Sequence, residues 1–269
     1  MTEPIWRATG DAASIYQNQI VPALMEEWAP RVANAAAILP GQRVLDVACG
    51  TGVLTRAAAH RAGPEGAVTG LDLSPRMLAL AASLNPNLSW SQGSAESLPF
   101  GDDSFDAVVS QFGLMFFHDP VLALREMMRV LVPGGRLAVA VWASLSETPA
   151  YAAEAALVER LAGAAAAAPL RAPFVLGDPD RLSEQFRAAG ITAKVTFESG
   201  LGTFPSVRAM VELDLRVLLP LMDVVLKEEL VAEILRQAEE AMSPFVTEGL
   251  GKITFASPAL LATAIKPVP

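Results

Sequence analysis

Cysteine and histidine are scarce in this sequence of 269 residues. Cys49 is the only cysteine, and His60 and His118 are the only histidines. A single cysteine cannot form a disulfide within the chain, and two histidines far apart without ligand-spaced partners do not make a zinc site. We therefore expect no internal disulfide and no structural metal.

Long apolar runs are also missing. Hydrophobic residues make up 52% of the chain, but charge, proline or glycine interrupts each apolar stretch before the roughly 18 residues that cross a membrane. Residues 1–10 show no basic segment followed by an apolar segment and a small-residue cleavage site. These absences predict a cytoplasmic protein without a transmembrane segment.

Dense basic clusters are absent as well. Asp and Glu number 29 against 20 Lys and Arg, which gives a formal net charge of −9. Such a charge repels a phosphate backbone, so nucleic acid is not an expected partner. Ordinary solubility accounts for the acidity.

What the sequence does contain is an alternation of short β-branched runs with helical patterns between residues 43 and 142. This alternation is typical of βαβ units and a parallel sheet. Ser74-Pro75 and Asp119-Pro120 each supply an N-cap followed by a first-turn proline. The expected strands are Arg43–Ala48, Ala67–Asp72, Leu88–Gln92, Phe105–Gln111 and Arg136–Trp142.

The flanking segments have mainly helical patterns. Residues 14–39 indicate one or two helices, broken around Pro22 and Pro30. Downstream we expect an alanine-rich helix over 149–168, a capped helix over 180–189, an extended segment over 192–204, amphipathic helices over 206–219 and 223–242 separated by Pro220, and a last strand between Lys252 and Lys266.

The most informative segment is Val44–Gly52, a buried strand that runs into a glycine turn and then a helix. Gly50 and Gly52 allow a tight turn and let a ligand approach the backbone, and the helix N-terminus offers free N–H groups. Asp72 ends the next expected strand, twenty residues beyond Gly52. A carboxylate there can accept hydrogen bonds from both ribose hydroxyls, so this register predicts a nucleotide-cofactor pocket.

Two details distinguish S-adenosylmethionine from NAD as the expected cofactor. A dinucleotide site has a third glycine three residues after the second, where this chain has Thr55. Asp46, just before the turn, opposes a pyrophosphate but favours the ammonium group of a methionine moiety, directly or through water. The pattern favours S-adenosylmethionine, with an NAD-dependent oxidoreductase as the weaker alternative.

Five motifs between residues 43 and 142 carry a resemblance to a known family. They are Val44–Gly52, Gly70–Leu78, Gly93–Phe100, Ser104–Leu114 and Leu124–Leu137. With them the chain resembles class I S-adenosylmethionine-dependent methyltransferases, of the small-molecule group that includes the ubiquinone/menaquinone C-methyltransferases. The resemblance implies S-adenosylmethionine as donor, S-adenosylhomocysteine as product, and an apolar small molecule as acceptor at O, N or C.

The resemblance also assigns positions around the cofactor. Asp72 would hold the ribose, Ala95 would meet an adenine edge through its backbone, and Gln111 would contact the methionine part. Ser94 stands where the family often has an aspartate that recognises the adenine amino group, and its hydroxyl accepts that bond more weakly. Ala48 replaces a glycine, a change we expect to be harmless. The expected cofactor set is Asp46, Ala48, Gly50, Thr51, Gly52, Asp72, Leu73, Met77, Ser94, Ala95, Glu96 and Gln111.

Residues for the methyl acceptor are expected at the same end of the sheet. Aromatic and methionine side chains there serve equally well as pocket or as core. The expected acceptor-facing residues are Tyr16, Met25, Trp28, Phe112 and Met115. His118 follows the fourth strand, but a loop histidine beside the Asp119 cap explains it, and no catalytic residue is assigned. A protein that binds the cofactor without transferring methyl is the second functional hypothesis.

The predicted fold is α/β: a Rossmann-like, doubly wound, mostly parallel seven-stranded sheet with helical cap additions. We expect an N-terminal helical lid at 1–39, the S-adenosylmethionine-binding core at 40–142, helices, the sixth strand and a substrate cap at 143–250, and the last strand of the sheet at 251–269. The apolar side of segment 206–242 fits either the sheet or a second subunit, which leaves a homodimer open.

Overall fold

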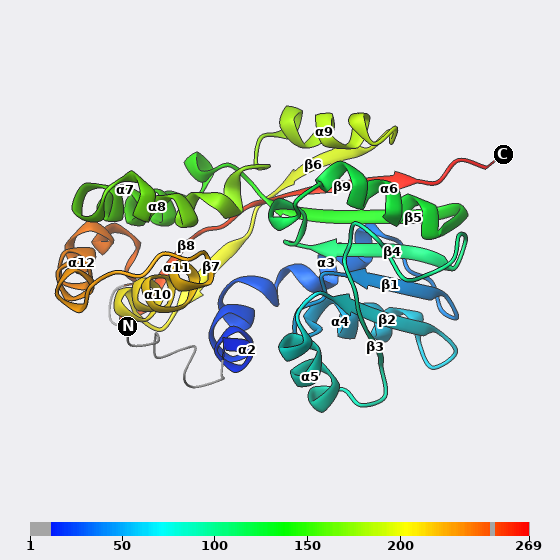
Figure 1. Cartoon of the computed structure of the whole chain (residues 1–269), viewed down its shortest axis with the longest axis horizontal. Coiled ribbons are helices and arrows are strands. Elements are labelled where there is room, and N and C mark those ends of the chain that lie inside the picture. Colours follow the sequence, from blue (N-terminus) through cyan, green and yellow to red (C-terminus); the bar gives the residue numbers. More distant parts are fainter. Residues whose placement is uncertain (1–11, 248–250, 269) are drawn as a thin grey trace.

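The computed structural model describes residues 12–247 and 251–268, so residues 1–11 of the expected lid, residues 248–250 and Pro269 lie outside it. Seven strands form one sheet in the order β3-β2-β1-β4-β5-β9-β6 (Figure 1). They are β1 (Arg43–Val47), β2 (Ala67–Asp72), β3 (Ser89–Gln92), β4 (Phe105–Gln111), β5 (Leu131–Trp142), β6 (Lys194–Glu198) and β9 (Ala259–Ile265). β9 pairs antiparallel with both β5 and β6, and the other neighbouring strands of this sheet pair in parallel. The predicted doubly wound, mostly parallel sheet is confirmed.

The order of the strands fixes where a ligand can bind. β1 to β2 and β4 to β5 cross the sheet in opposite directions, so right-handed crossovers place α4 (Val53–Ala62) and α6 (Pro120–Val130) on opposite faces. α3 (Trp28–Ala35) packs against α4, α5 (Pro75–Leu84) against β2 and β3, and α9 (Pro179–Ala188) against α6. The direction reverses between β1 and β4, which opens the crevice at their carboxyl ends.

The two predicted N-caps of the core are present. The Ser74 side chain accepts a hydrogen bond from the Met77 N–H, and the Asp119 side chain accepts one from the Leu122 N–H. A proline occupies the first turn of each helix, where no N–H is needed. These local signals explain why α5 and α6 begin where the sequence predicts.

A helical cap lies beside the carboxyl ends of the strands, to the left in Figure 1. Its elements are η3 (Leu145–Glu147), α7 (Pro149–Ala162), α8 (Ala164–Arg171), η4 (Ala172–Phe174), α10 (Val207–Leu213), η5 (Asp214–Leu218), α11 (Leu219–Leu221), α12 (Glu228–Ala241) and η6 (Ser243–Phe245). The single helix expected over 149–168 is wrong, because Gly163 at φ +88° separates α7 from α8. The expected break at Pro220 is also wrong, because helical structure continues through it and α12 begins later.

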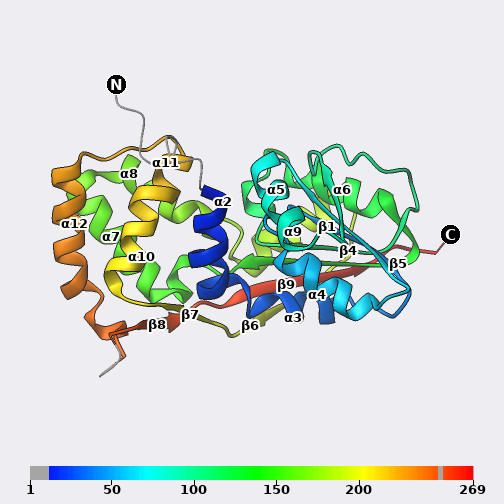
Figure 2. The same ribbon diagram turned by 90° about the horizontal axis from the view of Figure 1, so that it is seen from below.

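The N-terminal segment lies between the cap and the core (Figure 2). α2 (Ala12–Ile15) continues into the π-helix η1 (Tyr16–Met25), which runs through Pro22, so the break expected there is wrong. The chain instead interrupts its helix at residues 26–27, and Pro30 lies in the first turn of α3, where proline is tolerated. No helix among the described residues is long and apolar enough to cross a membrane.

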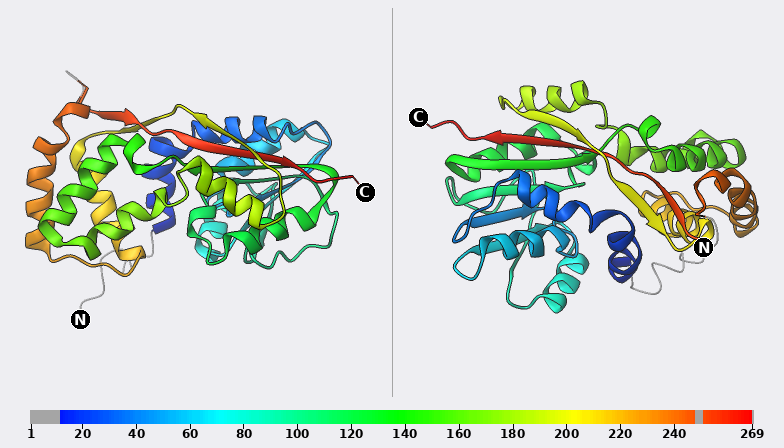
Figure 3. Two further views of the ribbon diagram at one scale, coloured as in Figure 1. Left: turned by 90° about the horizontal axis from the view of Figure 1, so that it is seen from above. Right: turned by 180° about the vertical axis from the view of Figure 1, so that it is seen from behind.

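Two long segments form a ribbon that joins core and cap (Figure 3). β6 pairs with β9 in the main sheet, and β7 (Leu201–Phe204) pairs with β8 (Ile253–Ala256) in a separate two-stranded sheet. The extended segment expected over 192–204 comprises β6 and β7, and the last strand expected between Lys252 and Lys266 is β9, which β8 precedes. The ribbon bends at Gly200 and Ser257, whose N–H donates to the Gly200 carbonyl at 2.9 Å. A Cβ on Gly200 would lie 2.3 Å from the Trp28 ring, so Trp28 fills the bend.

Candidate cofactor site

The predicted glycine turn follows β1 at the point where the strand order reverses. Gly50 and Gly52 have φ values of +56° and +85°, which side chains rarely allow. Ala48 also has a positive φ, +59°, a conformation that costs an L-residue roughly 1–2 kcal/mol. A Cβ on Gly113, at the end of β4, would lie 2.7 Å from the Ala48 methyl group. Glycine at 113 thus makes room for an alanine that carries backbone strain.

Asp72 ties this turn to the end of β2. Its Oδ2 accepts the N–H of Gly50 at 2.8 Å, and its Oδ1 accepts the N–H of Ser74 at 2.8 Å. The carboxylate therefore lies between the first two loops of the core, where the sequence predicts a ribose. Leu73 beside it is 70% exposed.

Asp46, at the end of β1, is a buried carboxyl with one free oxygen. Its Oδ2 accepts a hydrogen bond from the Thr55 hydroxyl at 2.6 Å, whereas its Oδ1 has no partner among the described residues. Burial raises the pKa of Asp46 to about 7; the Asp72 charge adds to this, and the Thr55 bond opposes it. Thr55 thus does more than replace the third glycine of a dinucleotide site, because its hydroxyl donates to Asp46.

Further buried polar atoms near the turn have no partner in the described part of the chain. They are Thr51 Oγ1, Ser110 Oγ, Gln111 Oε1 and Gln17 Oε1. Buried polar groups are normally hydrogen-bonded, so each of these needs an explanation. With Asp46 Oδ1, they lie after β1, at the end of β4 and on η1. A ligand with ammonium, carboxylate and hydroxyl groups fits this set of donors and acceptors.

The loop after β3 carries the residues expected beside adenine. The Ser94 hydroxyl accepts the N–H of Glu96 at 3.2 Å, and Ala95 is buried. The Glu96 carboxylate accepts the N–H of Asp119 at 3.0 Å, which attaches this loop to the start of α6. Met77, on the first turn of α5, is half-buried.

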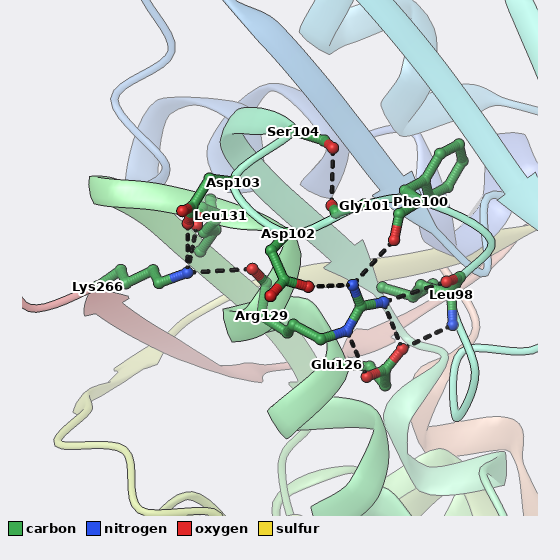
Figure 4. Close-up of polar contacts among 10 residues, drawn as sticks. All are labelled: Leu98, Phe100, Gly101, Asp102, Asp103, Ser104, Glu126, Arg129, Leu131 and Lys266. Carbon is green, nitrogen blue, oxygen red and sulfur yellow. Dashed lines mark hydrogen bonds and ion pairs between the residues drawn. The ribbon is translucent and has the colours of Figure 1, made fainter.

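Glu126 and Arg129 of α6 hold the same loop farther along (Figure 4). The Glu126 carboxylate accepts two bonds from the Arg129 guanidinium, each 2.7 Å, and the N–H of Leu98 at 2.9 Å. Arg129 also donates to the carbonyls of Leu98 and Phe100 at 3.1 and 2.9 Å, and to Asp102 at 2.8 Å. Arg129 lowers the pKa of Glu126. Glu126 and Arg129 lie within the sequence motif Leu124–Leu137. The hydrogen bonds from Arg129 to backbone carbonyls of the loop cannot be predicted from sequence spacing.

Tyr16 and Met25 of η1 lie against the turn and β4. A Cβ on Gly50 would lie 3.5 Å from the Tyr16 ring. Burial raises the pKa of Tyr16, and the charges of Asp72 and Asp46 add to the shift. The Gln111 side-chain amide donates to the Met25 carbonyl at 3.0 Å. The N-terminal segment thus covers the end of the sheet where the cofactor residues gather.

Trp28, Phe112 and Trp142 form an aromatic cluster behind that segment. Trp28 is 0% exposed, and its ring meets Phe112 and Trp142 edge-on with centroids 6.0 and 6.3 Å away. Phe112 stacks on Trp142 at 3.5 Å and has a φ of +56°, unusual for a bulky residue. Trp28 is a core residue that fastens α3 to β4 and β5. Met115 is also buried, whereas His118 is exposed in the loop before α6.

A second buried acidic pair lies in the cap, outside this site. Glu154 of α7 and Asp214 of η5 are 0% and 5% exposed, and both Glu154 oxygens and Asp214 Oδ2 have no hydrogen-bond partner among the described residues. Burial raises the pKa of Asp214 to about 7 and the pKa of Glu154 well above its usual value. The sequence predicts no such pair, and the one local signal for it is a glutamate within the alanine-rich segment.

Comparisons with known proteins match the part of the chain that contains this site to methyltransferases. Residues 45–139 match the methyltransferase domain family. The demethylmenaquinone methyltransferase of Renibacterium salmoninarum is 42% identical over 137 residues, which are 51% of this chain and 54% of that protein. The 2-phytyl-1,4-naphtoquinone methyltransferase of Thermosynechococcus vestitus is 38% identical over 125 residues, 45% of this chain and 56% of that one. The chain spans about half the length of the curated relatives it matches.

Solved structures show the fold over most of the chain. The YcgJ protein of Bacillus subtilis superposes with a TM-score of 0.60 at 20% identity, covering 90% of this chain and 99% of that one. The [4+2]-cyclase SpnF superposes with a TM-score of 0.54 at 23% identity, covering 91% and 82%. Residues 45–139 thus match a methyltransferase domain and lie on a Rossmann-like sheet, and the chain is similar to class I S-adenosylmethionine-dependent methyltransferases of the quinone-modifying group.

Proposed function

We propose that this chain transfers the methyl group of S-adenosylmethionine to an apolar small molecule. The observation that carries the proposal is a pair of carboxylates at adjacent strand ends. Asp72 bridges the glycine turn and the β2 loop, and Asp46 keeps a buried, unpartnered oxygen next to it. The Asp72 carboxylate can accept hydrogen bonds from two ribose hydroxyls, and the free Asp46 oxygen can accept one from an ammonium group. The domain match over residues 45–139 supports the same donor.

The chain's own residues would hold the cofactor in two groups. When bound, S-adenosylmethionine supplies an electrophilic methyl group on a sulfonium. Adenine resting on Leu73 would remove its exposed side chain from water. On the adenosyl side stand Asp72, Leu73, Met77, Ser94, Ala95 and Glu96, and on the methionine side stand Asp46, Ala48, Gly50, Thr51, Gly52 and Gln111.

The acceptor would lie between the N-terminal segment and the end of β4. Tyr16, Met25, Phe112 and Met115 offer an apolar surface there, with Trp28 supporting Phe112 from behind. Direct displacement of the methyl group needs an oriented acceptor and exclusion of water, which a cap and a lid provide. A general base is needed only for an acceptor that keeps its proton at neutral pH. The acceptors named for the relatives, demethylmenaquinone and a phytyl naphthoquinone, support an apolar class.

Two measurements test the proposal. Calorimetric titration of the full chain with S-adenosylhomocysteine and with NAD should show saturable binding of the first only. Radiolabelled methyl donor incubated with an acceptor library that includes demethylmenaquinone should yield a methylated product. Binding of NAD alone would overturn the cofactor assignment. Saturable S-adenosylhomocysteine binding with no product from any acceptor would favour a cofactor-binding protein without methyl transfer.

We also propose the arrangement of the additions. Residues 12–25 would act as the lid of the expected segment 1–39, and the helices between 149 and 241 as the substrate cap. A homodimer stays a prediction, which sedimentation of the purified chain checks.

A further inference from the structure

The loop between β3 and β4 has almost no secondary structure of its own. Within it, an isolated bridge joins Ser94 to Ser97, and no helix follows β3. Yet Ser94, Ala95 and Glu96 are the residues proposed to meet adenine. Reading a base edge requires these atoms to be held in place before the ligand arrives. Something outside the loop must therefore fix it.

Besides the bond from the Asp119 N–H to Glu96, Arg129 holds this loop from outside. It donates to the carbonyls of Leu98 and Phe100 and to the Asp102 carboxylate, so it contacts the loop at three points (Figure 4). Its guanidinium is oriented by two bonds to Glu126, which in turn accepts the Leu98 N–H. The planar guanidinium of arginine has several donors in fixed directions and can bind all these acceptors at once, whereas the single ammonium of lysine cannot.

We infer that Arg129 is a positioning residue for adenine recognition, acting on Ser94–Glu96 through the carbonyls of Leu98 and Phe100. This inference rests on the proposed function, because it assumes that the loop meets the adenine of the cofactor. Glu126 belongs to the same device, since it orients Arg129 and holds the Leu98 N–H.

Lys266 supplies a matched control on the far side of the same loop. Its ammonium donates to Asp103 at 2.7 Å and to the carbonyls of Arg129 and Leu131 at 3.0 and 2.6 Å. The side chains of Lys266 and Arg129 are similarly exposed, 23% and 31%. Lys266 therefore stabilises the base of the loop but makes no contact with the carbonyls of residues 98 and 100.

The test compares two ligands in three forms of the full chain. Wild type, Arg129→Lys and Lys266→Met are titrated with S-adenosylhomocysteine and with S-inosylhomocysteine, which lacks the adenine amino group. Wild type should prefer S-adenosylhomocysteine. Arg129→Lys should bind it about tenfold more weakly and lose most of the preference, as expected when charge-assisted bonds that order a site are lost. In turnover assays the KM for the methyl donor should rise with kcat nearly unchanged. Lys266→Met should keep the preference.

Each result of this experiment supports or overturns the inference about Arg129. An Arg129→Lys protein with wild-type affinity and preference overturns the inference, as does an equal loss of preference in Lys266→Met. If Arg129→Lys does not fold, Glu126→Gln takes its place, because it keeps an acceptor for Leu98 while removing the charge that orients Arg129. If wild type binds neither ligand, the proposed function itself fails.

Discussion

Asp72 is a single side chain that serves both the fold and the proposed site. Asp72→Ala should weaken S-adenosylhomocysteine binding roughly ten- to a hundredfold, because a charge-assisted bond contributes about 1.5–3 kcal/mol. It should also lower the free energy of unfolding, because the N–H groups of Gly50 and Ser74 lose their acceptor. Calorimetric titration and urea denaturation measure the two effects.

Asp106 gives the control for that experiment. Its carboxylate accepts the backbone N–H of Arg43 and pairs with its guanidinium at the opposite end of the sheet. Asp106→Ala should reduce stability without changing affinity. An Asp72→Ala protein that binds with wild-type affinity would disprove the placement of the ribose.

Ser94 allows a sharper prediction about the base. Its hydroxyl already accepts the Glu96 N–H, and an aspartate could keep that bond with one oxygen while offering the other to an exocyclic amine. Ser94→Asp should therefore keep or raise the affinity for S-adenosylhomocysteine, because carboxylates accept more strongly than hydroxyls. Ser94→Ala should lower it by about 0.5–1.5 kcal/mol. Ser97→Asp, an equal change of charge at an exposed position of the same loop, should leave it unchanged. Loss of binding in Ser94→Asp alone would show a differently shaped adenine site.

At the scale of elements, the N-terminal segment is the part that should respond to ligand. η1 packs Tyr16 over Gly50 and receives a hydrogen bond from Gln111 at Met25, whereas α3 is fixed by Trp28 in the core. Backbone amides of residues 12–25 should become protected from hydrogen exchange when S-adenosylhomocysteine binds. Those of Trp28–Ala35 and of β1 should exchange slowly in both states. Equal exchange of residues 12–25 with and without ligand would refute the lid.

The elements of the core were predictable because their signals are local. Ser74-Pro75 and Asp119-Pro120 mark helix starts on their own, and the strands between them are short apolar runs. The elements of the cap depend on distant contacts. The chain passes from β6 to β7 through Gly200, where the Trp28 ring occupies the space that a Cβ would need, a contact 172 positions away in the sequence. No pattern within residues 192–204 contains that information.

In the candidate site, too, the residues with local sequence signals were predictable and the contacts made by the fold were not. Sequence spacing predicts the roles of Gly50, Gly52 and Asp72, because each follows or ends a strand that is visible as an apolar run. The bond from Thr55 to Asp46 could have been predicted, because only the glycine turn separates the strand that holds Asp46 from the helix that holds Thr55. The bonds from Arg129 to backbone carbonyls join groups whose proximity only the fold creates, and the fold alone buries Glu154 near Asp214.

At the scale of the whole molecule, buried carboxyls in both core and cap should make stability depend on pH. Burial raises the pKa values of Asp46 and Asp214 to about 7, from an ordinary value of 3.8. Between these values the folded chain binds more protons than the unfolded chain, so stability should fall as the pH rises from about 4 to about 7. Each group contributes a slope of at most about 1.4 kcal/mol per pH unit.

Urea denaturation between about pH 5 and about pH 8 checks this dependence. Asp46→Asn and Asp214→Asn should each flatten the profile, because an amide does not titrate. A wild-type protein of equal stability across that range would contradict the burial of Asp46 and Asp214.

The place of β9 has a consequence for how the chain folds as it is synthesised. β9 is the last strand in sequence, yet it lies between β5 and β6 rather than at an edge. Until the ribosome has made residues 259–265, β5 has no neighbour on that side and β6 has none at all. The nascent chain must keep the unpaired edge of β5 from other chains while the whole cap is being translated. Cutting the chain before Ala259 would therefore open the sheet from within, not shorten it.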